Sequence, residues 1–197
     1  MDVAKRKEFL NLPNYISLAR IISVPILVVL LMLIGKDNAP NVWNQLISFL
    51  SALAYGIASF SDVVDGFLAR RYNVQGTFGK FFDPLADKVL NLAAMIMLIP
   101  LVRMPAWLVV LVLVREVTIT MLRGVASNEH IIIQASKWGK YKNAFGSFGI
   151  AFIILYFPFF GVKWELIGWV LLLISVVFSV GSGIHYVWNF VKEISKR

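Results

Sequence analysis

The sequence predicts an all-α integral membrane protein, folded as one bundle of six transmembrane helices. Of its 197 residues, 59% are apolar or aromatic and 15% are charged, whereas a soluble domain usually has about 25% charged residues. Six apolar stretches approach the roughly 20 residues that a helix needs to cross a bilayer. The chain has no cysteine, which excludes disulfide scaffolds, Cys-ligated zinc and cysteine nucleophiles.

Each predicted span ends where helix-interrupting residues begin. Gly and Pro occur at 35–40, 76–79, 105 and 161, between the apolar stretches. No repeat or flexible linker divides the chain, so we expect a single domain over residues 1–197. The expected spans are residues 15–34, 43–69, 82–101, 106–122, 145–160 and 165–187.

Lys and Arg are unevenly distributed among the segments that join these spans. The N-terminal arm, the connections after the second and fourth spans, and the C-terminal tail are rich in them, while the other three connections carry Lys36, Arg103 and Lys163. The positive-inside rule then places both termini in the cytoplasm and the protein in the cell membrane as a multi-pass protein. This distribution also explains the net charge of +8 without a nucleic-acid partner.

The first residues predict an arm at the membrane surface. Residues 1–12 mix basic and apolar side chains, which favours a short amphipathic helix on the anionic cytoplasmic leaflet, followed by the bundle over 13–197. A cleaved signal peptide is the alternative. It is disfavoured because Arg20 lies within the first apolar run and no small-residue cleavage site follows that run.

Four aspartates occur where charge is costly, near the adjoining ends of the second and third spans. Asp62 and Asp65 are three residues apart, and Asp83 and Asp87 are four apart, so each pair projects from one helix face. The short connection makes the two helices antiparallel neighbours, which brings all four carboxylates to the cytoplasmic edge. Two carboxylates about 6 Å apart repel by roughly 3 kcal/mol at an effective dielectric near 20. Oxygen ligands alone favour Mg²⁺ or Mn²⁺, as one or two ions.

Other roles for these residues remain open when each is taken alone. An Asp can cap a helix or pair with Arg70, Arg71 or Lys88. A glycine such as Gly66 or Gly79 can serve a packing contact rather than the close approach of a ligand. Taken together, the four carboxylates favour the metal site.

The whole pattern, Asp62-x2-Asp65-Gly66-x2-Ala69-Arg70-x8-Gly79-x3-Asp83-x3-Asp87, resembles the signature of the CDP-alcohol phosphotransferases. That family transfers a phosphatidyl or related group from a CDP-linked donor to an alcohol and releases CMP. The resemblance implies that the four aspartates hold the metal and that Asp87 is also the general base. It further implies a set of donor-binding residues: Asp62, Gly66, Ala69, Arg70 and Gly79.

Within that family the chain is most similar to the branch that uses CDP-diacylglycerol and sn-glycerol 3-phosphate. The segments 11–20 and 79–88 and the pair Arg115-Glu116 carry this similarity, while Asn143 and Gly146 stand where the branch usually has Thr and Gln. A phosphorylated acceptor needs cations, and the candidates are Arg115, Arg123, Lys137, Lys142 and Arg20. The alternatives are a pairing of Arg115 with Glu116 and ordinary cytoplasmic loop charge for the lysines.

Several functional alternatives follow from the same residues. A cardiolipin synthase of this family, or another CDP-diacylglycerol-dependent phosphatidyltransferase, would keep the aspartates and change the acceptor. A divalent-cation transporter would use the aspartates as an ion path. Besides membrane lipids, we expect a second copy of the chain as a partner, because Ser175, Ser179 and Gly183 form a stripe of small residues. That stripe suits either a homodimer contact or close packing inside the bundle.

Overall fold

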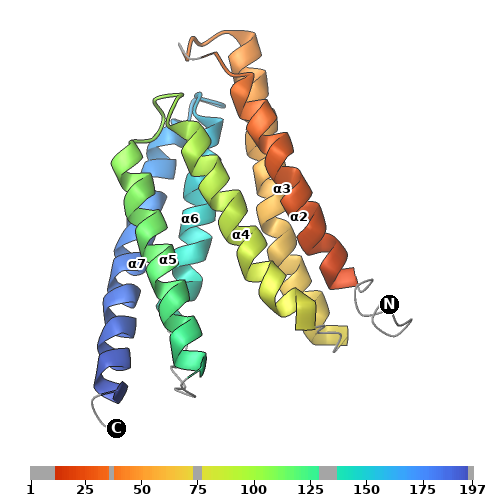
Figure 1. Cartoon of the computed structure of the whole chain (residues 1–197). Coiled ribbons are helices and arrows are strands. Elements are labelled where there is room, and N and C mark those ends of the chain that lie inside the picture. Colours follow the sequence, from red (N-terminus) through yellow and green to blue (C-terminus); the bar gives the residue numbers. More distant parts are fainter. Residues whose placement is uncertain (1–11, 36–37, 73–76, 129–136, 195–197) are drawn as a thin grey trace.

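The computed structural model describes residues 12–35, 38–72, 77–128 and 137–194, and within the helices it gives the backbone alone for 12–18, 62–72, 77–84, 127–128, 137–140 and 193–194. The predicted arm therefore lies almost wholly outside the described residues. Six helices make up the described part of the chain, and consecutive helices run in opposite directions (Figure 1). They are α2 (Leu12–Met32), α3 (Val42–Tyr72), α4 (Thr77–Leu98), α5 (Ala106–Asn128), α6 (Lys137–Leu155) and α7 (Trp164–Ile194).

All six helices extend past the predicted spans at one end of the bundle. There α3 continues to Tyr72, α5 to Asn128 and α7 to Ile194, while α2 begins at Leu12, α4 at Thr77 and α6 at Lys137. Hydropathy marks only the apolar part of a helix, whereas Lys, Arg and Glu are good helix formers that prolong it into a polar environment. The all-α prediction is confirmed for the described residues, and α2 begins at the same end where α7 finishes (Figure 1).

Two groups of helices build the bundle, with α4 between them (Figure 1). Helix α2 packs against both α3 and α4, and α6 and α7 share the most extensive contact. Helix α3 reaches α6, α5 lies on α7, and α4 also touches α5 and α6. The shared core is aliphatic; its fully buried members include Leu27, Leu31, Leu90, Leu98 and Ile153.

A single buried arginine fastens the end of the bundle opposite the chain termini. Arg103, in the connection from α4 to α5, is 1% exposed. Its Nε donates to Asn38 Oδ1 (2.9 Å), and its Nη1 donates to Ser48 Oγ (3.1 Å) and to the carbonyl of Ile154 (2.9 Å). The guanidinium also lies 4.1 Å from the centre of the Tyr156 ring. One side chain thereby joins α3, the end of α6 and two connections.

Burial lowers the pKa of Arg103 to about 10, against the opposing effects of Tyr156 and Glu165. The guanidinium therefore remains protonated at neutral pH and keeps all its donors.

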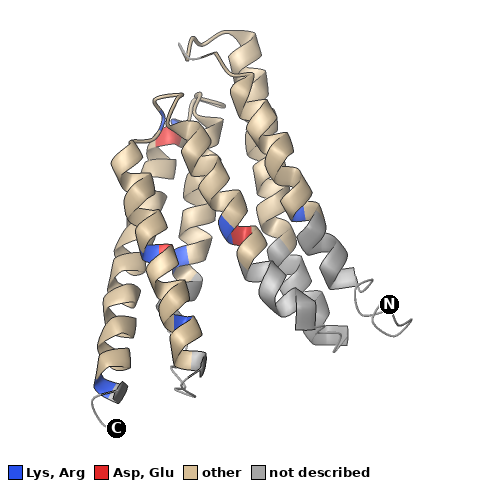
Figure 2. Cartoon of the chain, in the orientation of Figure 1, with Lys and Arg blue, Asp and Glu red and all other residues tan. Residues whose placement is uncertain are grey.

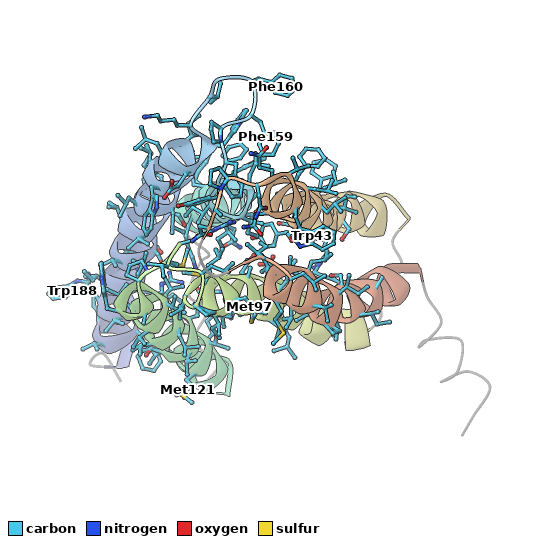
Figure 3. All side chains as sticks on the ribbon, turned by 90° about the horizontal axis from the view of Figure 1, so that it is seen from above. Trp43, Met97, Met121, Phe159, Phe160 and Trp188 are labelled. Atoms are coloured by element: carbon cyan, nitrogen blue, oxygen red, sulfur yellow. The ribbon has the colours of Figure 1, made fainter. Side chains whose placement is uncertain are left out.

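Much of the outer surface is apolar. Helix α5 alone exposes Trp107, Val110, Val114, Val117 and Met121, a patch unusual for a soluble monomer. Met121, Phe160 and Trp188 point away from the bundle (Figure 3). One helix of the described residues, α7 over Trp164–Lys192, is both long and apolar enough to cross a bilayer, and Ala19–Met32 and Tyr141–Leu155 are apolar but shorter.

Glycine allows α6 and α7 to cross at backbone contact. A Cβ added to Gly168 would lie 2.8 Å from the amide nitrogen of Ile153, and one added to Gly149 would lie 2.8 Å from that of Leu172. Both contacts are with backbone, so neither helix can accommodate even a methyl group without separating. The crossing therefore fixes how α6 presents its polar residues.

The small-residue stripe of α7 also faces the interior. Ser175 Oγ donates to the carbonyl of Lys142 on α6 (2.7 Å), and the carbonyl of Ser179 accepts from Arg115 Nε on α5 (3.0 Å). Gly183 lies against the same guanidinium, 3.5 Å from Arg115 Nε when a Cβ is built. Of the two roles considered for this stripe, the structure shows close packing inside the bundle.

The glycine crossing makes a stability prediction. We expect Gly168→Ala to destabilise the protein by about 1–3 kcal/mol, because the methyl group meets immovable backbone. Gly181→Ala is the matched control on the same helix: nothing lies within 4 Å of its Cβ, so the substitution should stabilise the helix by up to about 1 kcal/mol. Thermal unfolding in detergent measures both, and an unchanged melting temperature for Gly168→Ala would contradict the contact.

Candidate active site

A cavity of about 90 Å³ opens between α4, α5, α6 and α7. Its polar lining comes from all four helices: Asp87, Lys88, Asn91, Glu116, Lys142, Asn143, Ser147, Ser175 and Ser179. Gly146 and Val176 lie at the level of these polar residues, whereas Leu92, Met95, Val112, Ile150 and Leu172 lie further along their helices toward the Arg103 end. The cavity is therefore polar toward the end where α7 finishes and apolar toward the other.

Glu116 lies among three cations from three helices. Its carboxylate pairs with Arg115 Nη1 at 2.8 Å, with Lys142 Nζ in direct contact, and with Lys88 Nζ at 3.8 Å. Figure 2 shows the charged patches of α4, α5 and α6 at a similar height, with a mostly uncharged band between them and the connections at the Arg103 end. Among the described residues, these three cations face the carboxylate of Glu116 and that of Asp87, which lines the same cavity, so positive charge is in excess.

Arg115 is held in place independently of Glu116. Its Nε donates to the carbonyl of Ser179 and its Nη2 donates to Ser182 Oγ (2.7 Å). Two neutral acceptors on α7 thus fix the plane of the guanidinium, while Nη1 faces the carboxylate. A guanidinium held in this way is ready to bind an oxyanion without a further loss of side-chain entropy.

Lys88 links α4 to α5. Its Nζ donates to Thr120 Oγ1, and that hydroxyl donates in turn to the carbonyl of Glu116 one turn earlier (2.6 Å). The side chain of Lys88 is about one-third exposed, more than that of Lys142 or Arg115. Of the three cations, Lys88 is therefore the one most accessible to solvent.

Asp87 lines the same cavity, one turn before Asn91 on α4. Asn91 Nδ2 donates to Asp87 Oδ1 (3.4 Å), and Asn91 Oδ1 accepts from the hydroxyl of Tyr55 on α3 (2.6 Å). The carboxylate of Asp87 is thus connected through an amide to a phenol in the core.

The structure brings three of the predicted residues together and places two others elsewhere. Asp87, Lys142 and Arg115 meet at or behind the cavity wall. Arg20 is 2% exposed and donates to the carbonyl of Ala58 on α3 (3.1 Å), and the guanidinium of Arg123 lies 5.7 Å from the Tyr186 ring. The side chains of the remaining predicted residues lie outside the description: Asp62, Asp65, Gly66, Ala69, Arg70, Gly79, Asp83 and Lys137.

The backbone of the aspartate motif is nevertheless described. Asp62 and Asp65 lie on α3, and Asp83 and Asp87 lie on α4, in two antiparallel helices that contact each other. Among the described side chains no group of three or more His, Cys, Asp or Glu surrounds a metal position. The donor set is chemically suited to a hard divalent ion, because it consists of carboxylate oxygens from adjacent helices.

Sequence reasoning missed Glu116, Lys88 and Asn91 as cavity residues. The adjacent charges Arg115-Glu116 within an apolar run are a signal that both are functional, since charges inside a span are costly. The pairing of these two residues was weighed as an alternative and is present. The convergence of Lys142 and Lys88 on the same carboxylate depends on helix packing, which a single sequence does not reveal.

Residues 10–181 match the family model described as CDP-alcohol phosphatidyltransferase. The chain belongs to this family, which confirms the resemblance carried by the aspartate pattern.

Three relatives of this chain share one name. A Bacillus subtilis protein named CDP-diacylglycerol–glycerol-3-phosphate 3-phosphatidyltransferase is 36% identical to this chain, over 89% of the chain and 93% of its own length. A Rickettsia typhi protein with the same name is 31% identical, over 89% of the chain and 94% of its length. A Mycoplasma pneumoniae protein, also so named, is 31% identical over 76% of the chain and 70% of its length.

The cation cluster generates a prediction about anion binding. Glu116→Gln leaves three cations without their carboxylate, so we expect a loss of about 2–4 kcal/mol of stability. Inorganic phosphate should restore part of it, raising the melting temperature of the variant more than that of the parent. Glu165→Gln, which removes a carboxylate in the first turn of α7 and outside the cluster, is the control. Equal stabilisation of parent and variant by phosphate would contradict the prediction.

Proposed function

We propose that this chain transfers the phosphatidyl group of CDP-diacylglycerol to sn-glycerol 3-phosphate, giving phosphatidylglycerol phosphate and CMP. The observation that carries this proposal is the shared cavity: Asp87 of the family motif and Lys142 with Glu116 line the same space. The relatives at 31–36% identity bear names that describe this reaction.

The charge of the cavity suits a phosphorylated acceptor. Among the described residues of this cavity, Lys88, Arg115 and Lys142 outnumber the carboxylates of Glu116 and Asp87, which favours an anionic acceptor. Arg115 can offer parallel N–H donors to two phosphate oxygens, and Lys142 and Lys88 act as point charges. We assign the acceptor phosphate to these residues, with Lys137 as a further candidate. Arg20 and Arg123 would need to act from outside this cavity.

The donor belongs with the aspartate motif. Asp62, Asp65, Asp83 and Asp87 would hold one or two Mg²⁺ or Mn²⁺ ions, and Asp62, Gly66, Ala69, Arg70 and Gly79 would line the nucleotide site, as the family resemblance implies. The ions would neutralise charge on the pyrophosphate oxygens and improve CMP as a leaving group.

Asp87 is the general base in this proposal. Its carboxylate accepts the proton of the acceptor hydroxyl as that oxygen bonds to the phosphorus bearing the diacylglycerol. The bond from this phosphorus to the CMP oxygen breaks, and CMP leaves with the electron pair. The acceptor phosphate, bound by Lys142 and Arg115, would present the hydroxyl toward Asp87.

The proposed function requires the protein to lie in a membrane. All six helices span the bilayer in this reading, with both termini and the cavity's polar side at the cytoplasmic face. The exposed apolar surface of α5 and the length and composition of α7 support it. Acyl chains of the donor would remain in the bilayer while its nucleotide reaches the cavity.

The activity is tested by CMP release from CDP-diacylglycerol in detergent with Mg²⁺ or Mn²⁺. We expect release with glycerol 3-phosphate, little release with phosphatidylglycerol or without acceptor, and none in EDTA. Release with phosphatidylglycerol alone would assign a cardiolipin-forming reaction to the same cavity. Metal flux into liposomes without CMP release would contradict the enzymatic reading.

The role of Asp87 has its own test. Asp87→Asn should lower kcat by about 10²–10⁴-fold, because the amide cannot accept the hydroxyl proton. Binding of CDP-diacylglycerol, measured with the purified variant, should change little, since three aspartates of the motif remain. A loss of donor affinity as large as the loss of rate would count against the general base and favour a metal ligand alone.

A further inference from the structure

We propose that Tyr55 and Asn91 form a buried hydrogen-bond chain that positions the carboxylate of Asp87 for catalysis. Neither residue belongs to the aspartate motif. The inference deepens the proposed function and depends on Asp87 acting in it.

The hydrogen-bond chain begins at Tyr55, whose side chain is held in the core. Tyr55 is 1% exposed and lies in the same core cluster as Leu90 and Ala94 of α4. Its ring therefore cannot turn without disturbing the contact between α3 and α4. The hydroxyl donates to Asn91 Oδ1 at 2.6 Å, across 36 residues of sequence.

This hydrogen bond sets the orientation of the Asn91 amide. With Oδ1 toward the phenol, Nδ2 faces Asp87 Oδ1 at 3.4 Å, one helical turn away. The reverse orientation would point the amide oxygen at a carboxylate that can only accept hydrogen bonds, so the two oxygens would repel. The phenol and the carboxylate thus select the same orientation.

The carboxylate needs such support because the cavity offers it competing partners. Lys88 follows Asp87 in sequence and lines the same cavity, as does Lys142. An ammonium group forms a stronger hydrogen bond with a carboxylate than an amide does. A donor tied to the core directs Oδ1 of Asp87 toward Asn91 and so sets how the carboxylate is presented to the reacting hydroxyl.

Removing a hydrogen bond that orients a metal-ligating side chain typically costs about 10–100-fold in metal affinity or activity, and the proposed function counts Asp87 among the metal ligands as well as assigning it the proton. The expected signature is a loss in kcat rather than in substrate binding, because Tyr55 and Asn91 are not among the residues assigned to the acceptor phosphate or the nucleotide.

The test compares kcat and KM for glycerol 3-phosphate in Tyr55→Phe, Asn91→Leu and the double variant. We expect about a 10-fold lower kcat for Tyr55→Phe and a 10–100-fold lower kcat for Asn91→Leu, with KM within about twofold of the parent. The double variant should be no worse than Asn91→Leu, because in this proposal the hydroxyl of Tyr55 affects Asp87 through the Asn91 amide.

Ser51→Ala is the matched control. It removes another fully buried hydroxyl from α3, one turn from Tyr55, that donates to the carbonyl of Ile47 (2.7 Å) and does not reach the cavity. Its kcat should equal the parent's, and melting temperatures of all variants report folding.

The outcomes separate this inference from the proposed function. A kcat for Tyr55→Phe and Asn91→Leu equal to that of Ser51→Ala, or additive losses in the double variant, would overturn the positioning role. Full activity of Asp87→Asn would overturn the proposed role of Asp87 itself. Loss of activity in Asp87→Asn with no effect in the other variants rejects the hydrogen-bond chain alone.

Discussion

Charge inside an apolar bundle must be balanced, and the pairing of Glu116 with cations from three helices is how this chain achieves it. A lone carboxylate or ammonium there would cost several kcal/mol, so each charged residue requires its partners to be delivered by neighbouring helices. The glycine contact between α6 and α7 places Lys142 at the cavity, and α7 in turn anchors Arg115. The packing of α6 and α5 against α7 therefore also determines which charged side chains are paired.

An excess of cations distinguishes this cluster from a structural salt bridge. A purely structural pair would match charge for charge, whereas among the described residues Lys88, Arg115 and Lys142 outnumber the carboxylates of Glu116 and Asp87. The excess is stable only with an anion or with solvent at the site, which is a common property of sites that bind phosphorylated ligands.

The sequence predicts the helices because apolar runs and their Gly and Pro boundaries are local properties. It does not predict that α3 continues to Tyr72 or α5 to Asn128, because polar helix ends resemble loops in hydropathy. The aspartate spacing predicts where chemistry occurs on the chain, and Asp87 does line a cavity. The sequence does not predict a role for Tyr55, because an aromatic residue in an apolar run is typical of a core position. Its hydrogen bond to Asn91 depends on how α3 packs against α4.

The position of Arg103 bears on the side from which reactants reach the cavity. Arg103 joins α3, α6 and two connections at one end of the described bundle, and the aliphatic part of the cavity lining lies toward that end. In the membrane orientation proposed above, water-soluble reactants would reach the polar part of the cavity from the side where α7 finishes. A bundle tied together at its other end would let chemistry on a lipid proceed without a path for ions across the bilayer.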